Sequence, residues 1–366
     1  MVGRQGDEFR LKDKCLIIAL LISLAGTTLA QSQGNAQPEH GSTIKVTEEN
    51  FRIHRSDGRI ATLDDIAKSM ANYDAVLLGE NHDDPSAHYI EAELLRLAAE
   101  RYETATGTAK NEQGAKPRAV VLSLEMFERD VQTMIDEYLS GLITEDHFIK
   151  SARAWPNYKS DYRPMIEYAK QRRLTVIAAN APRRYVNIVS RMGNQSLAKL
   201  SAQAKTWLPP LPYREASASY AEKFRGVMGH LERPAPTVEK KPEGNPNGQG
   251  KLSEGSSQGD GEKESRFQKA MAAQSLWDAS MAHAIAGQLK KDSRSLVIHV
   301  NGRFHSEERM GIPDHLSHYR PGTRILIVTV LSEKDFPHFD SEKHSRMGDF
   351  VILTDPLLPR SGRGSS

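Results

Sequence analysis

The pattern Gly-x-x-His occurs twice in the chain, each time after a short, mainly apolar run. The first copy is Gly-Glu-Asn-His at 79–82, after the run 75–78, and the second is Gly-Arg-Phe-His at 302–305, after the run 296–301. Short apolar runs of this kind are typical of strands buried in the middle of a parallel sheet. Each motif therefore places its histidine just beyond the carboxyl end of a predicted strand.

A third predicted strand, 119–124, ends at Glu125. Because parallel strands bring their carboxyl ends to one edge of a sheet, we expect His82, His305 and Glu125 to meet there. Two imidazoles and one carboxylate leave coordination positions open, as in catalytic sites that hold zinc, iron or manganese. Glu80, inside the first motif, would be a further ligand or a general base that takes a proton from metal-bound water.

A simpler interpretation of the two motifs is ordinary turn chemistry. Glycine followed by a polar residue is common where a strand ends, so the two copies could be unrelated turns. In that case Glu80 and His82 would only cap the helix predicted to start near Pro85. The repeat of the motif and the glutamate at a third strand end favour the shared site.

The first thirty residues have the pattern of a secretory signal peptide. Basic residues precede the apolar run 15–26, and small residues follow it up to Ala30. This run is too short for a membrane span, so we expect cleavage near Ala30, with a short retained anchor as the alternative. Cys15, the only cysteine, precedes the run and is misplaced for lipid attachment. A mature chain without cysteines forms no disulfide or thiolate metal site, which favours the bacterial periplasm.

Beyond the leader, strand-like and helix-like stretches alternate along the chain. Predicted helices cover 87–102, 127–139, 163–173 and 267–289, and further strands cover 174–179, 324–331 and 350–354. This alternation predicts an α/β fold with a mostly parallel central sheet, flanked by helices and joined by right-handed crossovers.

The composition predicts one domain with irregular segments around and within it. Residues 31–45 are a polar lead-in, 46–358 form the α/β domain and 359–366 are a flexible tail. Within the domain, 232–266 is rich in Pro, Gly, Ser and charged residues, so it is expected to be a disordered surface insertion. The chain has 49 basic and 47 acidic residues, which argues against a broad basic surface for nucleic acid.

Several segments that contain these motifs resemble a known family, the ChaN-like haem-binding uptake proteins of the Tiki superfamily. The similar segments, in matching order, are LLGENHDDPSAH, LSLEMFERDVQ with the following DEYLSG, WPNYKSDYRPMIEYAKQ, VIAANAPRRYV, QSLWDASMA and HVNGRFHSEERMGIP. They span nearly the whole predicted domain except the insertion. This resemblance is far more specific than one Gly-x-x-His motif.

The resemblance implies an exported α/β protein of Gram-negative bacteria that binds haem or an iron compound and serves haem or iron acquisition. Its haem-binding members form dimers that hold haem between the subunits, so a homodimer is expected. Members are often outer-membrane lipoproteins, but Cys15 is misplaced for lipid attachment, so peripheral association with that membrane is expected in place of a lipid anchor. The wider superfamily includes metal-dependent proteases, and by motif match their site would be His82, Glu125 and His305. The alternative function is therefore a metal-dependent hydrolase.

Haem requires an axial ligand such as His or Tyr and cations for its propionates. The candidates are Tyr158 and Tyr162 with Arg163 beside Trp155, and Arg183 after the strand 174–179. Aromatic residues at this spacing are also common in cores, and Arg183 would equally suit the start of a helix with Asn180 near its N-cap.

Overall fold

The computed structural model describes residues 44–103, 117–231 and 256–361. The predicted signal peptide, 1–30, lies outside the described residues, as do most of the lead-in and residues 232–255 of the predicted insertion. Across these described ranges, no helix combines the length and the apolar character that a membrane crossing requires.

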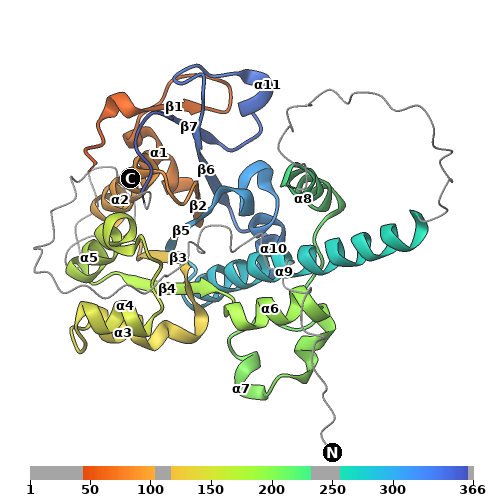
Figure 1. Cartoon of the computed structure of the whole chain (residues 1–366). Helices are drawn as coiled ribbons and strands as arrows, with labels where there is room; N and C mark the ends of the chain where they lie inside the picture. The colour runs from red at the N-terminus through yellow and green to blue at the C-terminus, as the bar shows by residue number, and fades with distance from the viewer. Residues whose placement is uncertain (1–43, 104–116, 232–255, 362–366) are drawn as a thin grey trace, which may run out of the picture.

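The centre of the fold is one sheet of seven strands in the order β1-β7-β6-β2-β5-β3-β4 (Figure 1). β1 pairs antiparallel with β7, and every other neighbouring pair is parallel. The strands are β1 (Phe51–Arg55), β2 (Ala75–Glu80), β3 (Val120–Glu128), β4 (Thr175–Asn180), β5 (Leu296–Gly302), β6 (Ile325–Ser332) and β7 (Phe350–Thr354). The predicted α/β fold with a mostly parallel sheet is confirmed.

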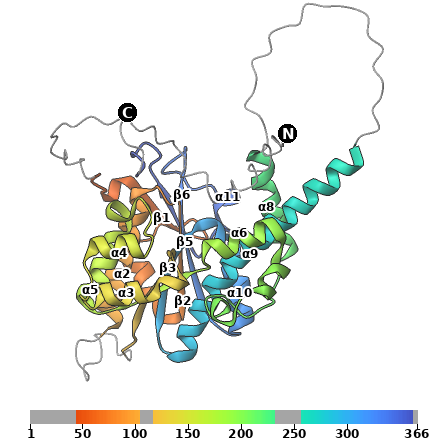
Figure 2. The same cartoon turned by 60° about the horizontal axis from the view of Figure 1, so that its bottom comes forward.

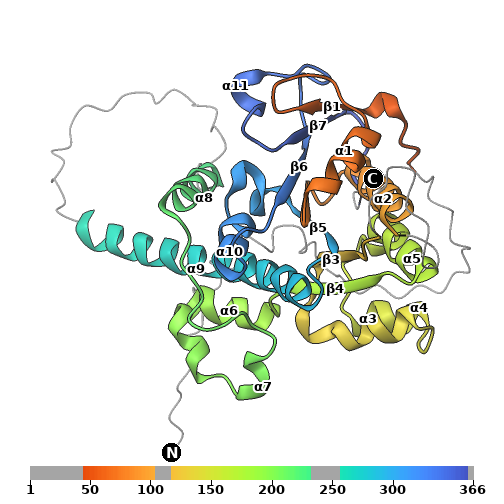
Figure 3. The same cartoon turned by 180° about the vertical axis from the view of Figure 1, so that it is seen from behind.

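Helices cover both faces of the sheet, as the view in Figure 2 shows. One face carries α1 (Leu63–Ser69), α2 (Pro85–Tyr102), α3 (Gln132–Leu139), α4 (Glu145–Ser151) and α5 (Arg163–Arg172). The other carries α6 (Arg183–Met192), α9 (Ser256–Lys291) and α10 (Ile312–Tyr319), with α7 (Ala202–Lys205) and α8 (Ala218–Leu231) farther out; α11 (Ser341–His344) precedes β7. Figure 3 shows α9 running across the back of the sheet.

Successive side chains of β2 point alternately into the hydrophobic cores on the two faces of the sheet. Val76 and Leu78 belong to the core shared with α1 to α5, whereas Ala75 and Leu77 belong to the core under α9 and α10. All four side chains are at most 1% exposed, which explains why the run is apolar throughout and does not alternate with polar residues.

Two predicted boundaries differ in the structure. Phe127, expected to start a helix, is the eighth residue of β3 and is buried, because β3 continues past a register shift to Glu128. Residues 256–266, expected within the disordered insertion, instead form the first turns of α9. There Glu264 pairs with Arg225 of α8 at 3.0 Å, which joins the two helices.

The expected flexible tail, 359–366, is anchored in its described part. Arg360 lies 3.1 Å from the buried carboxylate of Asp84, and the backbone NH of Ser361 donates to the carbonyl of Asp83 at 3.0 Å. These contacts hold the end of the chain against the start of α2. Residues 362–366 lie outside the described part of the chain.

Candidate functional site

The two Gly-x-x-His motifs meet at the carboxyl edge of the sheet. β2 and β5 are neighbours, and their register places Glu80 opposite Gly302. The backbone NH of Gly302 donates to Oε2 of Glu125 at 2.6 Å, which brings the end of β3 to the same point. We call this group of three side chains, His82, Glu125 and His305, the strand-end crevice, because open α/β sheets place their ligand crevices at this edge.

Both glycines allow a close approach that a side chain would prevent. A Cβ atom at Gly302 would lie 2.9 Å from Nε2 of His82 and 3.6 Å from Cδ2 of His305, so both imidazoles lie against the same Cα. A Cβ atom at Gly79 would lie 2.9 Å from the Cα of Arg303, within the second motif. The motif glycines therefore let the two loops pack together and bring the two histidines side by side.

A buried carboxylate holds the Nδ1 atom of each histidine. His82 Nδ1 lies 2.7 Å from Oε1 of Glu80, and His305 Nδ1 lies 2.6 Å from Oδ1 of Asp278 in α9. Nε2 of His305 is 3.7 Å from Oε1 of Glu125. This carboxylate-histidine arrangement fixes each ring and leaves its second nitrogen for a ligand, as it does in metal sites.

Nearby carboxylates raise the pKa values of both crevice histidines. Burial lowers the pKa of His82, but the hydrogen bond to Glu80 and the charges of Glu80 and Glu125 outweigh it and raise that pKa to about 9. Burial likewise opposes charge on His305, yet Glu125 and Asp278 raise its pKa. Both imidazoles therefore favour the protonated form, and a metal ion that binds here must displace those protons.

Behind His82 lies a second group of buried polar residues. Both oxygens of Glu80 have contacts: Tyr162 OH donates to Oε1 at 2.8 Å, and His88 Nδ1 is 3.0 Å from Oε2. His88 also contacts Glu91 at 3.2 Å and Asp161 at 3.3 Å. The charge of His88 and the hydrogen bond from His82 keep the pKa of Glu80 well below its usual range, although burial opposes them. Glu80 therefore orients imidazoles here, whereas Glu125 borders the crevice.

Trp155 and Arg183 form the rim of the crevice next to His82. The Trp155 ring packs edge-on against the imidazole, with ring centres 4.9 Å apart. The guanidinium of Arg183 lies 5.8 Å from the centre of the Trp155 ring and 3.9 Å from Oε1 of Glu128, and the Arg183 side chain is 55% exposed. An aromatic face and an accessible cation thus lie beside one motif histidine.

The other predicted haem-binding residues occupy different surroundings. Tyr158 is buried and packs against Phe148, with ring centres 5.6 Å apart. Arg163 pairs with Glu145 at 2.6 Å on the protein surface. Of the predicted set, the structure thus places Tyr162 and Arg183 at or beside the site and places Tyr158 and Arg163 elsewhere. Their role in haem binding stays a prediction.

The donors of the crevice fit a first-row divalent metal in type. They are two imidazole nitrogens and one carboxylate oxygen, a set that suits zinc, iron or manganese. Among the described residues, however, a different group meets the distance that a shared metal ion requires. Glu80, His88 and Glu91 each have a ligating atom within 4.8 Å of those of the other two. Metal binding by His82, Glu125 and His305 therefore stays a prediction.

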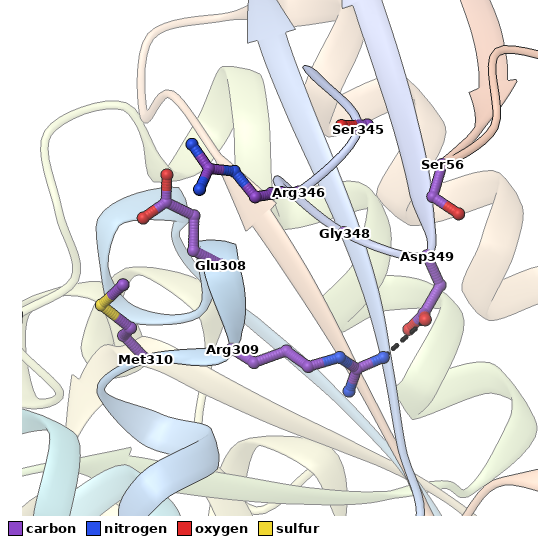
Figure 4. Close-up of a pocket in the computed structure, with 8 residues that line it drawn as sticks. All are labelled: Ser56, Glu308, Arg309, Met310, Ser345, Arg346, Gly348 and Asp349. Carbon is purple, nitrogen blue, oxygen red and sulfur yellow. Dashed lines mark hydrogen bonds and ion pairs between the residues drawn. The ribbon is translucent and has the colours of Figure 1, made fainter. Parts of the chain in front are cut away.

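A separate surface cavity of about 460 Å³ lies beyond the second motif (Figure 4). Its lining residues are Ser56, Glu308, Arg309, Met310, Ser345, Arg346, Gly348 and Asp349. Figure 4 shows Arg309 reaching across it to the carboxylate of Asp349, with which it forms an ion pair. None of the predicted site residues lines it.

Four buried residues around the two motif histidines were not predicted from the sequence: His88, Glu91, Asp161 and Asp278. Two signals could have revealed some of them: His88 and Glu91 are three residues apart on a predicted helix, and Asp278 is an acidic residue on an otherwise mainly apolar helix face.

Comparison with known proteins identifies the family. The sequence model described as "Haem-binding uptake, Tiki superfamily, ChaN" matches residues 66–316. A comparison with curated proteins found no match.

Three solved structures are similar to this one. The structure described as "Cofacial heme binding to ChaN of Campylobacter jejuni" is 15% identical, with a TM-score of 0.57, and the match covers 84% of this chain and 98% of that chain. The type III effector HopBA1 is 9% identical with a TM-score of 0.39, over 80% of this chain and 93% of that one. A succinoglycan biosynthesis protein is 12% identical with a TM-score of 0.38, over 74% and 69%. Because the family match spans most of the described domain, the chain belongs to the ChaN family of haem-binding uptake proteins in the Tiki superfamily.

Proposed function

We propose that this protein binds haem and serves haem or iron acquisition. The observation that carries the proposal is the family match over residues 66–316, which includes both Gly-x-x-His motifs. The Campylobacter jejuni protein of the same fold is described as binding haem cofacially, which supports the same ligand here. The homodimer expected from the family resemblance is part of the same proposal.

The rim of the strand-end crevice offers the chemistry that haem needs. His82 has a side chain that is 26% exposed, and its ring is held by Glu80 through Nδ1, so that Nε2 is the nitrogen available to iron. Trp155 supplies an aromatic face, and the exposed cation of Arg183 suits a propionate. The proposed haem site is therefore the surface over His82, Trp155 and Arg183.

Haem titration of the purified protein tests the proposal. We expect a shift of the Soret band with a micromolar or lower Kd, and light scattering should show a doubled mass in the haem complex. His82→Ala should weaken binding at least tenfold through loss of the axial nitrogen, whereas His318→Ala, at an exposed position on α10, should leave it unchanged. No Soret shift at tens of micromolar protein, a limit of roughly −6 kcal/mol, would exclude haem as the ligand.

This experiment tests haem binding and the assignment of His82 as the axial ligand separately. If His82→Ala binds haem as well as the unaltered protein does, the axial ligand lies outside the crevice, but the protein still binds haem.

We also propose export to the periplasm and peripheral association with the outer membrane. The support is the order of basic residues, apolar run and small residues within 1–30. Mass spectrometry of the protein from the periplasm should give an N-terminus near Gln31, and an intact or acylated N-terminus would contradict this.

A metal-dependent hydrolase is the second candidate function. The specific observation in its favour is that both motif histidines are held by carboxylates and border Glu125. Metal analysis and peptide hydrolysis assays on the haem-free preparations separate the two functions. Hydrolysis that requires metal and disappears in His305→Ala would support the enzyme.

A further inference from the structure

Glu80, His88 and Glu91 form a buried cluster behind the crevice, which we call the inner triad. Glu80 is the last residue of β2, and His88 and Glu91 lie one turn apart on α2. The three side chains are at most 4% exposed. One ligating atom from each lies within 4.8 Å of the other two. No predicted function of the crevice uses Glu91 or His88.

The hydrogen bonds around His88 define which nitrogen faces the carboxylates. Nε2 lies 3.3 Å from both Oδ2 of Asp161 and the carbonyl oxygen of His82, two acceptors that require a proton on Nε2. Nδ1 then faces Oε2 of Glu80 at 3.0 Å and Oε2 of Glu91 at 3.2 Å. Two carboxylate oxygens this close to Nδ1 require a positive charge between them, which is either a second proton on His88 or a bound cation.

The remaining contacts leave the ligating atoms free for such a charge. Tyr162 OH and His82 both bind Oε1 of Glu80, so Oε2 is the oxygen that faces the triad. Oε1 of Glu91 is buried and has no hydrogen-bond partner among the described residues. A buried carboxylate oxygen without a partner is costly, and a bound cation removes that cost.

We propose that the inner triad binds one divalent first-row transition-metal ion of the Zn²⁺ class, separately from any ligand of the crevice. One imidazole and two carboxylates form a mixed nitrogen and oxygen donor set that such ions accept. Asp161 is the outer carboxylate that orients His88, as Glu80 does for His82. The bound ion would join β2 to α2 directly beneath the first Gly-x-x-His motif.

Zinc retention by the full chain tests this inference. The metal-free protein is incubated with Zn²⁺, passed through gel filtration and analysed for zinc by mass spectrometry. Glu91→Gln removes one ligand charge with little change of shape and should lower zinc affinity at least tenfold at this site. The matched control is Glu93→Gln on the same helix, because Glu93 pairs with Arg96 and lies outside the triad. Zinc retention by Glu91→Gln equal to that of the unaltered protein would overturn the proposal.

Two further measurements keep the test independent of folding and of the crevice. His305→Ala, which disrupts the crevice, should still hold zinc in the inner triad. Crystals of the unaltered protein soaked in Zn²⁺ should give an anomalous difference peak between Glu80, His88 and Glu91. A zinc-saturated crystal without that peak would show that a proton, and not a metal ion, fills the triad. Neither result depends on haem binding.

Discussion

Replacing Gly311 with alanine is expected to lower the free energy of unfolding by about 3 kcal/mol or more, through backbone strain and a steric clash. Gly311 precedes α10 with φ +71° and ψ −109°, a conformation that residues with a side chain rarely adopt. A Cβ atom there would lie 2.6 Å from the carbonyl oxygen of His305 and 3.1 Å from Oδ1 of Asp278. Because Asp278 holds the His305 ring, relief of the clash would also displace the crevice histidine.

Gly322→Ala is the matched control for this substitution. Gly322 has a similar φ of +79°, but nothing lies within 4 Å of the position that its Cβ would take. Its replacement should therefore cost only the strain of the left-handed conformation, about 1 kcal/mol. Urea denaturation of the two variants measures the difference. Equal losses of stability would mean that the loop after the second motif adjusts freely and that Gly311 does not support the site.

The edge of the sheet could be predicted from the sequence because two local signals coincide there. Apolar runs of strand length identify buried parallel strands, and the residues after them must lie at the carboxyl edge. The sequence cannot show which strands are neighbours. The structure places β2 beside β5 and β5 beside β3, so that Gly302 contacts both Glu125 and His82.

The residues that orient the crevice could not be predicted in the same way. Asp278 lies on α9 and meets His305 only because α9 crosses the back of the sheet. His88 and Glu91 lie on the buried side of α2, where the 3.6-residue period would normally predict apolar residues. His88 contacts Glu80 and Asp161, which belong to other elements, so the periodicity of α2 alone cannot predict these contacts.

The aromatic stretch after Trp155 shows how local backbone geometry limits prediction. Tyr158–Tyr162 form a single turn of π-helix, which differs from the helix period assumed for an amphipathic stretch. This turn directs Tyr158 toward Phe148 and Tyr162 toward Glu80. Two tyrosines that looked equivalent as haem ligands therefore have different surroundings, and both are buried.

In metal-free protein, the free energy of unfolding is expected to be greatest near pH 6.5 and to fall on either side. The pKa of His82 rises from 6.5 unfolded to about 9 folded, so its stabilising proton is fully held below pH 6.5 and is lost as the pH rises to 9. At about 1.4 kcal/mol per pKa unit, this loss is on the order of 3 kcal/mol. Burial and the charge of Glu80 raise the pKa of Glu91 to about 8, and its ionisation destabilises the folded state in the same direction.

Below pH 6.5, buried neutral histidines make the folded state less stable as the pH falls. Burial and the charge of His305 lower the pKa of His299 to about 3, and burial lowers that of His283 to about 4. The unfolded chain therefore takes up protons that the folded chain does not bind, and stability falls as the pH drops below 6.5. Denaturation at pH 4.5, 6.5 and 9 in the presence of a chelator gives the profile.

Substitution of His82 tests whether this residue causes the loss of stability between pH 6.5 and 9. His82→Asn should reduce the loss of stability between pH 6.5 and 9 by roughly the 3 kcal/mol that its proton contributes. His318→Asn should leave the profile unchanged, because His318 is exposed on α10. If the unaltered protein is equally stable at pH 6.5 and 9, Glu80 does not hold a proton on His82. Added Zn²⁺ should flatten the same limb, since a metal ion at Nε2 replaces the proton that is lost as the pH rises.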